Sequence, residues 1–430
     1  MYVQNVNLSL YGGLASGVPG ELRGLQHLHK AYGKLPWATV MRPAINVARY
    51  GFLVTQDLVN HENAAIAGGP NFFLDDPSFA IDFAPNGTLL GLNETITRKR
   101  YADTLETIAE HGPDAFYTGA IANATIKALQ AANGTMTLED LKNYTVAIRK
   151  PAQIEYRDYR LTSCSAPSSG TVALAVMKTM EGYGDFGQQS AINLSTHRLD
   201  EAIRFAYGER ANLGDPSFVP GLDVYQEEML NETTAESIRS RISDLHTLNV
   251  SAYNPIGLES LETSHLCVLE TGVIMNNEMN DFSTPGESNA FGYIPSPSNF
   301  IKPGKRPLSS MSPTIVEFLS NNTLYYAIGS AGGSRIITAT IQNLWHVLDQ
   351  GATVAESLAE PRFHDQLSPN QISFEFAYDN QTVAFMESLG HNVTWAAPGR
   401  STAQGLRRMP NGTFEAGGEP RQHASGGFAV

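Results

Sequence analysis

The chain has 430 residues, 42% of them hydrophobic and 17% charged, a composition that supports a globular core and excludes a disordered chain. Its formal net charge of −14 disfavours contact with phosphate backbones, so nucleic acid is not expected as a partner. No run of 18 apolar residues occurs, so the sequence predicts no membrane-spanning helix.

The first half of the chain carries mainly helical patterns. Apolar side chains at helical spacing predict helices, in chain order, over residues 21–32, 38–50, 98–146, 172–183 and 195–210. Within the third of these segments, Thr137-Leu138-Glu139-Asp140 has the form of a helix start. The alternation of apolar and polar residues over 152–163 predicts a strand.

The second half changes character. Residues 220–262 are polar and uneven, which favours a surface linker. From Thr263 onward, short apolar runs over 266–269, 314–319 and 324–328 are separated by Gly, Pro and Ser and predict strands, and a helix is expected over 338–349. A helical part followed by a strand-rich part predicts an α+β fold with helices packed over stacked sheets.

Two features bear on the cellular compartment. Residues 1–5 have neither a basic region nor an apolar core, so they are not a signal peptide. Yet 13 of the 28 asparagines lie in Asn-X-Ser/Thr sequons, where chance gives roughly 4. The sequons are at Asn7, Asn86, Asn93, Asn123, Asn133, Asn143, Asn193, Asn231, Asn249, Asn321, Asn380, Asn392 and Asn411. We therefore expect a secreted glycoprotein whose leader precedes Met1.

The two cysteines, Cys164 and Cys267, allow one disulfide at most. We interpret them as two buried thiols, and the disulfide stays open as the alternative.

Three short constellations could carry chemistry: Thr263-Ser264-His265, the segment 276–282, and the loop pair 307–311 and 329–334. Taken singly, each has an ordinary structural interpretation. They are, in turn, a strand end, a solvated acidic turn, and loops with a tight glycine turn.

Other blocks accompany them in a fixed order. They are Gly17-Val18-Pro19-Gly20-Glu21, Gly33-Lys34-Leu35-Pro36-Trp37, Phe116-Tyr117, Glu139-Asp140-Leu141, Arg204-Phe205-Ala206-Tyr207, Leu213-Gly214-Asp215-Pro216, Pro303-Gly304-Lys305, Pro307-Leu308-Ser309-Ser310-Met311 and Gly332-Gly333. Together with the three constellations, this order resembles the γ-glutamyltransferase (glutathione hydrolase) family of N-terminal-nucleophile hydrolases, of the fungal type. The resemblance runs from about residue 12 to the tail at 425–427.

The resemblance implies a fold and a maturation step. The fold is an αββα sandwich of stacked, mainly antiparallel sheets covered by helices. Residues 1–262 resemble the large subunit and residues 263–430 the small subunit, which are separated by self-cleavage of the Glu262–Thr263 bond. Thr263 is then expected at the start of a central strand.

The resemblance also assigns site residues. Thr263 is the expected nucleophile, with its own α-amine as base, because a chain-terminal amine has a pKa of about 7.7–8.0. Gly332 and Gly333 are the expected oxyanion donors. Glu278 and Asp281 are expected to hold the substrate ammonium, and Ser309 and Ser310 its carboxylate, all within one cleft beside Thr263.

Two departures from the family pattern are visible. The family has an arginine, which pairs with the substrate carboxylate, ahead of the region matched here, and no residue of this chain takes its place. After Glu270 the family continues through a strand pair that bears a second threonine and an asparagine, whereas Thr271 follows here at once. We therefore expect a deletion near 270–271, and a chain that as written neither cleaves itself nor turns over substrate.

Three functions follow from these observations. The leading one is transfer of the γ-glutamyl group of glutathione or related compounds to water, an amino acid or a peptide. The second is an amidase on other γ-glutamyl amides or cephalosporin-type acyl groups, and the third is a catalytically inactive glycoprotein.

No cofactor is expected. The histidines do not cluster at ligand spacing in the sequence, and the Gly329–Gly333 loop lacks the Lys-Ser/Thr of a phosphate-binding loop. The expected location is extracellular or within the secretory pathway, with a signal or membrane anchor in the full-length protein.

Overall fold

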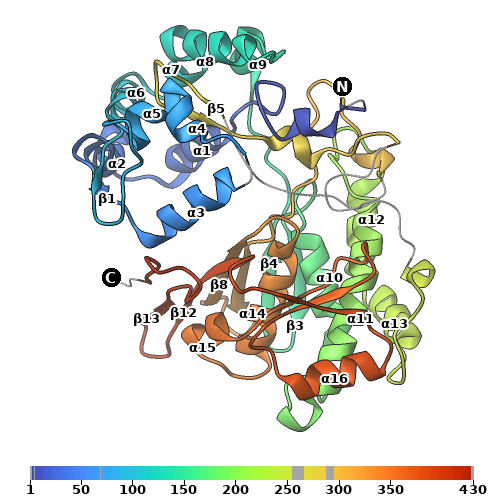
Figure 1. Ribbon diagram of the computed structural model, residues 1–430. Helices are drawn as coiled ribbons and strands as arrows, with labels where there is room; N and C mark the ends of the chain where they lie inside the picture. The colour runs from blue at the N-terminus through green and yellow to red at the C-terminus, as the bar shows by residue number, and fades with distance from the viewer. Residues whose placement is uncertain (1, 4, 68, 254–265, 287–294, 428–430) are drawn as a thin grey trace. The chain divides into compact units, whose positions relative to one another are not determined.

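The computed structural model describes residues 2–3, 5–67, 69–253, 266–286 and 295–427 (Figure 1). The chain divides into two units. The sheet unit comprises Arg149–Leu261 and Asp281–Val430, and the helical unit comprises Tyr2–Ile148 and Glu262–Asn280.

A six-stranded sheet in the order β13-β12-β8-β7-β4-β3 organises the sheet unit, and all its neighbouring strands are antiparallel. Its strands are β3 (Ala152–Tyr156), β4 (Tyr159–Ser163), β7 (Thr314–Phe318), β8 (Leu324–Ala331), β12 (Thr402–Arg408) and β13 (Phe414–Gly417). The strands alternate in burial: Ile154 and Val316 are buried on one face, whereas Gln153 and Ile315 point to the exposed face. Such alternation is typical of an antiparallel sheet with one solvated face.

Helices cover the buried face of this sheet. Helix α10 (Gly170–Glu181) packs on β3 and β4, α14 (Arg335–Leu348) packs on β8 and β12, and the two helices contact each other (Figure 1). Both are buried along most of their length; α10 is largely apolar, whereas α14 also buries polar side chains such as Gln342 and Asn343. The short helix α15 (Val354–Ala359) covers β12 and β13.

The next layer is built on these helices. Helix α11 (Ile192–Arg210) packs on α10, and α16 (Asn380–Ser388) packs on α11. A three-stranded sheet in the order β11-β10-β9 contacts α14 through β9. Its strands are β9 (Phe363–His364), β10 (Ile372–Glu375) and β11 (Val393–Ala396), and β10 pairs in parallel with β11.

The prediction of a linker over residues 220–262 was wrong for its described part. Helices α12 (Leu222–Met229) and α13 (Glu232–Arg241) and the 3-10 turn η3 (Val250–Tyr253) occupy it. Leu222, Met229 and Ile238 are buried, so a few well-spaced apolar side chains dock these otherwise polar helices.

The helical unit holds nine α-helices, a 3-10 helix η1 (Val6–Ser9) and two small two-stranded sheets within its described residues. The helices are α1 (Glu21–Tyr32), α2 (Trp37–Tyr50), α3 (Gln56–Ile66), α4 (Phe72–Asp75), α5 (Pro77–Phe83), α6 (Lys99–His111), α7 (Asp114–Tyr117), α8 (Gly119–Ala131) and α9 (Leu138–Asn143). The sheets pair β1 (Phe52–Leu53) with β2 (Thr95–Ile96), and β5 (Leu266–Cys267) with β6 (Ile274–Met275).

The hairpin of β5 and β6 bears directly on the predicted nucleophile. It is fixed to α6, because Thr104 Oγ1 donates to Thr271 O at 2.9 Å and the Arg98 guanidinium donates to Gly272 O. Thr263 lies outside the described residues. Among the described residues, β5 pairs with β6 in a sheet of two strands, and the prediction that Thr263 begins a central strand stays untested.

Most other element predictions are confirmed, and the class is α+β as predicted. The helix start at Thr137 is a capping box with Asp140. The single strand over 152–163 is instead the hairpin of β3 and β4, which turns at Arg157 with a φ of 54°. Both cysteines are free thiols. Among the described residues, no helix combines the length and apolarity needed to cross a membrane.

Candidate active site

Two consecutive glycines join β8 to the N-terminus of α14. Gly332 has a φ of 126° and Gly333 a φ of 58°, a left-handed region that favours glycine. Their carbonyls accept from Arg335 N and Ile336 N at 3.1 Å, which starts the helix. Neither glycine N–H donates to another residue that the structure describes. Two free N–H groups at a helix N-terminus are suited to stabilising an oxyanion.

The loop that holds these glycines is braced from behind. The Tyr207 hydroxyl donates to Ser334 O at 2.8 Å. His364 Nε2 donates to Gln366 Oε1 at 2.8 Å, which leaves His364 Nδ1 to accept from the Thr338 hydroxyl at 2.8 Å. Burial lowers the pKa of His364 to about 3, so the imidazole stays neutral. Its role here is structural bracing rather than proton transfer.

The serine pair lies in the loop ahead of β7 and is held from below. Ser309 N donates to Pro167 O at 2.7 Å, and Ser169 Oγ donates to Ser309 O at 2.6 Å. The buried Arg210 donates to Ser169 Oγ at 3.0 Å and to Ser310 Oγ at 3.3 Å. A guanidinium beneath two hydroxyls makes this loop favourable for a carboxylate.

Polar bridges connect these loops within the sheet unit. The buried Asn299 donates to Asp281 O at 2.7 Å and accepts from Leu308 N at 3.0 Å, so it links Asp281 to the serine loop. Ser312 Oγ, Thr340 Oγ1 and Ser330 Oγ form a chain with contacts of 3.3 and 3.1 Å. This chain joins the end of the serine loop to the strand that leads into the glycine pair.

Glu278 belongs to the other unit. It is exposed at the start of the 3-10 turn η4 (Glu278–Asp281), and its N–H donates to Asn276 Oδ1 at 3.1 Å. Asp281, Ser309, Ser310 and the glycine pair belong to the sheet unit. The convergence of all these groups beside Thr263 therefore stays a prediction.

The Gly17-Val18-Pro19-Gly20 block and the residue before it are hydrogen-bonded to Asn276. Asn276 Oδ1 accepts from Gly17 N at 2.8 Å, and Asn276 Nδ2 donates to Gly17 O at 3.2 Å. Ser16 Oγ donates to Asn276 O at 2.9 Å. The block anchors the backbone just before Glu278, and nothing in the local sequence pattern predicts this contact across more than 250 residues.

The fold brings together two histidines that do not lie at ligand spacing in the sequence. His197, Glu201 and His391 offer ligand atoms within 4.8 Å of one another. However, His197 Nε2 donates to Ser243 O at 2.7 Å, so His197 Nδ1 accepts from His391 Nε2 at 2.7 Å. Glu201 already accepts from Tyr253 and Thr247 at 2.8 and 2.6 Å. These contacts use both nitrogens of His197 and the carboxylate of Glu201 within the chain, while His391 Nδ1 lies 3.0 Å from Asp200 Oδ2, so we interpret the cluster as a polar core network.

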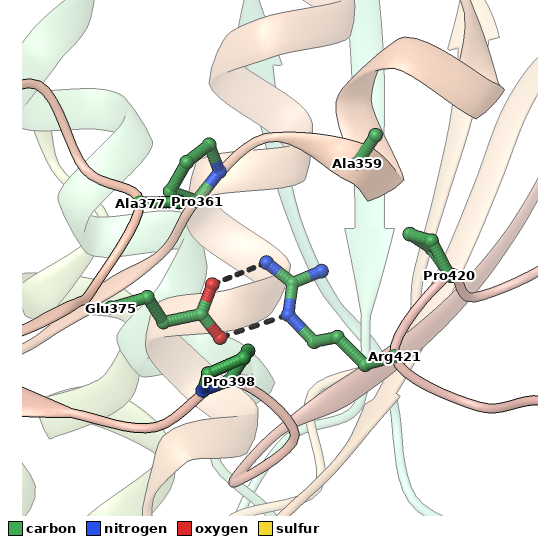
Figure 2. A pocket seen from close by; sticks show the side chains of 7 residues that line it. All are labelled: Ala359, Pro361, Glu375, Ala377, Pro398, Pro420 and Arg421. Carbon is green, nitrogen blue, oxygen red and sulfur yellow. Dashed lines mark hydrogen bonds and ion pairs between the residues drawn. The ribbon is translucent and has the colours of Figure 1, made fainter.

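A pocket of about 270 Å³ in the sheet unit lies apart from the predicted residues (Figure 2). Arg421 crosses it and donates to both carboxylate oxygens of Glu375, at 2.8 and 2.5 Å. The same guanidinium donates to the carbonyls of Leu358 and Glu360 at 2.7 and 2.8 Å. The donors of Arg421 are used within the chain, so this guanidinium is part of a structural ion pair. We therefore do not treat the pocket as a candidate site.

Comparison with known proteins shows the family of the chain. The model of the gamma-glutamyltranspeptidase family matches residues 1–271 and again residues 263–428. The chain is 52% identical to a glutathione hydrolase proenzyme of Arthroderma benhamiae, covering 100% of this chain and 78% of the relative. It is 46% identical to a glutathione hydrolase of Aspergillus flavus, covering 97% of this chain and 76% of the relative.

Two solved structures resemble the fold. A cephalosporin acylase from Bacillus halodurans has a TM-score of 0.82 at 25% identity, covering 98% of this chain and 79% of that one. A gamma-glutamyltranspeptidase of Helicobacter pylori has a TM-score of 0.50 at 30% identity, over 55% and 67%. The alignment with the Arthroderma relative spans 457 positions against 430 residues here, so that relative carries at least 27 positions that this chain lacks.

Proposed function

The chain belongs to the gamma-glutamyltranspeptidase family, and from that premise we propose that it is a glutathione hydrolase acting through a threonine acyl-enzyme. Water, an amino acid or a peptide is the acceptor of the γ-glutamyl group. The observation that carries the proposal is the glycine pair, whose two free N–H groups stand at the start of α14. Such a pair stabilises the charge that develops when a nucleophile attacks an amide.

The proposed chemistry begins at Thr263. Cleavage of the Glu262–Thr263 bond frees the threonine amine, which takes the proton of the hydroxyl as the oxygen attacks the γ-carbonyl carbon. The carbonyl oxygen becomes an oxyanion between Gly332 N and Gly333 N. The intermediate then collapses, the amine half of the substrate leaves with the proton, and the γ-glutamyl ester remains on Thr263 until the acceptor attacks it.

Substrate recognition is proposed to match a free α-amino acid head. The hydroxyls of Ser309 and Ser310 bind the substrate carboxylate. The buried Arg210, which donates to Ser310 Oγ, supplies positive charge without contacting the carboxylate itself. Glu278 and Asp281 hold the ammonium. The site therefore offers negative charge to the ammonium of the head group and positive charge to its carboxylate. This favours glutathione over amides that lack an α-amine.

The structural likeness to a cephalosporin acylase supports a second candidate, an amidase on larger acyl groups. The acidic pair Glu278 and Asp281 separates the two candidates. A γ-glutamyl substrate gains from these carboxylates, whereas an acyl substrate without an ammonium leaves them unpaired at a cost.

Maturation is part of the proposal. We propose that residues 1–262 and 263–430 become two subunits, and that a segment absent between Glu270 and Thr271 is needed for this step. The two family matches, which overlap at residues 263–271, support an interruption at this place. Secretion is proposed from the number of sequons.

We call the residues that the Arthroderma relative has between its counterparts of Glu270 and Thr271 the Arthroderma segment, and the function is tested on this chain with that segment inserted at the same place. We expect release of a chromogenic anilide from its γ-glutamyl derivative, abolished by Thr263→Ala. Glu278→Gln and Asp281→Asn should raise KM more than they lower kcat. Hydrolysis of a cephalosporin side chain in preference to the γ-glutamyl anilide would instead establish the second candidate.

A further inference from the structure

A buried asparagine joins the two loops to which the proposed function assigns the head group of the substrate. Asn299 Nδ2 donates to Asp281 O at 2.7 Å, and Asn299 Oδ1 accepts from Leu308 N at 3.0 Å, one residue before Ser309. We propose that Asn299 is a positioning residue, which sets the distance between the ammonium-binding and the carboxylate-binding loop and thereby selects ligands that carry both charges. This inference rests on the proposed function, which assigns Asp281 and Ser309 to the head group.

The main chain of Asn299 holds the loop of Asp281 a second time. Asn299 O accepts from Ser283 N at 3.1 Å, so the side chain and the main chain of one residue hold the carbonyl of Asp281 and the amide of Ser283. Ser283 Oγ in turn accepts from Ser296 N at 3.1 Å. Asp281, Ser283 and Asn299 are 5%, 1% and 1% exposed. In such a buried place water does not replace a lost hydrogen bond, so the loop depends on these contacts for its position.

Asn299 is itself held from both sides. The Lys305 ammonium donates to Ser298 O at 2.6 Å and to Phe300 O at 2.9 Å, which are the carbonyls on either side of Asn299. These residues form the end of the 3-10 turn η5 (Pro297–Asn299) and the residue that follows it. Hydrogen bonds from a charged donor are roughly twice as strong as those between neutral groups, so they keep the amide of Asn299 in one orientation.

The distance between the two loops matters only to a ligand that contacts both of them. Within a binding site, groups must be held to about 0.5 Å of their productive positions. A head group with an ammonium and a carboxylate reaches both loops at once, so a change in their distance weakens one of its two contacts. A ligand with a single charge uses one loop and can follow it. A purely structural role of Asn299 predicts instead that every ligand is weakened alike.

The test is a calorimetric titration of the whole chain with three small ligands. L-Glutamate carries the α-ammonium and the α-carboxylate of the head group, glutarate lacks the ammonium, and 4-aminobutyrate lacks the α-carboxylate. Asn299→Leu has a similar shape and no charge, and it removes both side-chain contacts. We expect it to weaken the binding of L-glutamate about tenfold and that of the other two ligands by less than about twofold.

Two further variants separate distance from stability. Asn299→Gln keeps the donor and the acceptor on a side chain that is longer by one methylene, so it should also reduce the preference for L-glutamate while it costs less stability than Asn299→Leu. Asn343→Leu is the matched control. Asn343 is also 1% exposed, and its amide donates to Ala339 O at 2.8 Å within α14 and accepts from Ser357 Oγ of α15 at 2.8 Å. We expect this control to lower the melting temperature and to leave the preference unchanged.

The outcomes separate the inference from the proposed function. If Asn299→Leu weakens all three ligands equally, or keeps the preference for L-glutamate, the inference is wrong and the proposed function stands. An equal loss of that preference in Asn343→Leu would also overturn the inference. If the parent chain shows no preference for L-glutamate, the head-group assignment of the proposed function fails, and the inference fails with it. Should circular dichroism show that Asn299→Leu is unfolded, Asn299→Gln decides in the same way.

Discussion

Gly332 is a residue whose backbone conformation and surroundings require glycine. A Cβ at this position would lie 2.5 Å from Arg400 O and 2.8 Å from Ser401 Cα, and its φ of 126° is unfavourable for any other residue. We expect Gly332→Ala to destabilise the fold by about 1–3 kcal/mol from backbone strain alone. Denaturant unfolding of the purified chain measures this change.

Gly329→Ala is the matched control, because a Cβ at Gly329 of β8 meets nothing within 4 Å. We expect this variant to unfold within about 0.5 kcal/mol of the parent. Equal stability of the two variants would show that the glycine pair is not held in the conformation described here, and would remove its assignment as an oxyanion site.

Asp200 gives a prediction on pH. Its side chain is fully buried, with Oδ2 3.0 Å from His391 Nδ1, and burial raises its pKa to about 8 from an ordinary value of 3.8. Between about pH 4 and pH 8 the folded carboxyl keeps a proton that the unfolded chain has lost, so this group's contribution to stability falls as the pH rises.

Asp200→Asn keeps a neutral side chain in both states. The melting temperature of this variant, relative to that of the parent, should therefore rise as the pH is raised from 4 to 8. A constant difference across that range would mean that Asp200 is already ionised in the folded protein.

At the level of single residues, the sequence identified the motifs but not the side-chain contacts that hold them in place. Gly332 and Gly333 occupy a turn whose φ values require glycine, as the sequence pattern suggested. Arg210 lies within a block that the sequence singles out, yet its contact with Ser310 spans 100 residues. No local periodicity encodes such a contact, and the same holds for Asn276 with Gly17.

At the scale of elements, Gln342 fastens α14 to β9. Its Nε2 donates to Phe363 O at 2.8 Å, and its Oε1 accepts from Phe363 N at 2.9 Å. Gln342→Leu leaves both backbone groups buried without partners, at about 1–3 kcal/mol each. We expect a loss of roughly 2–5 kcal/mol in the free energy of unfolding, measured by urea denaturation.

The exposed Gln153 of β3 provides a comparison. Among the described residues its amide donates to Thr162 Oγ1 at the surface, so Gln153→Leu should change stability by less than about 0.5 kcal/mol. If the two substitutions cost the same, the clamp between α14 and β9 contributes nothing, and another contact must fix the helix that follows the glycine pair.

Elements with strong periodicity were predictable, and elements docked by few side chains were not. The apolar runs of α10 and α14 and the spacing of α1 give clear signals, which the structure confirms to within a few residues. Helices α12 and α13 were not predicted from the sequence, because most of their residues are polar. Their docking depends on the buried side chains of Leu222, Met229 and Ile238. The turn at Arg157 was not predicted from the sequence, because arginine rarely adopts the positive φ that this turn has.

At the scale of the whole molecule, the deletion expected near residues 270–271 stays a prediction, and three observations bear on it. Helices cover one face of the sheet, while Ile315 and Leu406 on the strands β7 and β12 are 50% and 36% exposed. The turn between β5 and β6 spans only residues 268–273 and is tied to α6. The Arthroderma relative carries at least 27 positions more than this chain over the aligned region, enough for two strands of ordinary length.

The last prediction concerns self-cleavage. We expect the chain as written to remain one polypeptide, because cleavage before Thr263 requires neighbours that press its hydroxyl against the preceding carbonyl. Within the described part of the chain, β5 pairs with β6 through two residues on each side. Insertion of the Arthroderma segment between Glu270 and Thr271 should restore these neighbours and produce two fragments. Gel electrophoresis and N-terminal sequencing distinguish the outcomes, with Thr263→Ala as the control. Fragments that begin at Thr263 in the unmodified chain, and vanish in the control, would show that the short hairpin suffices.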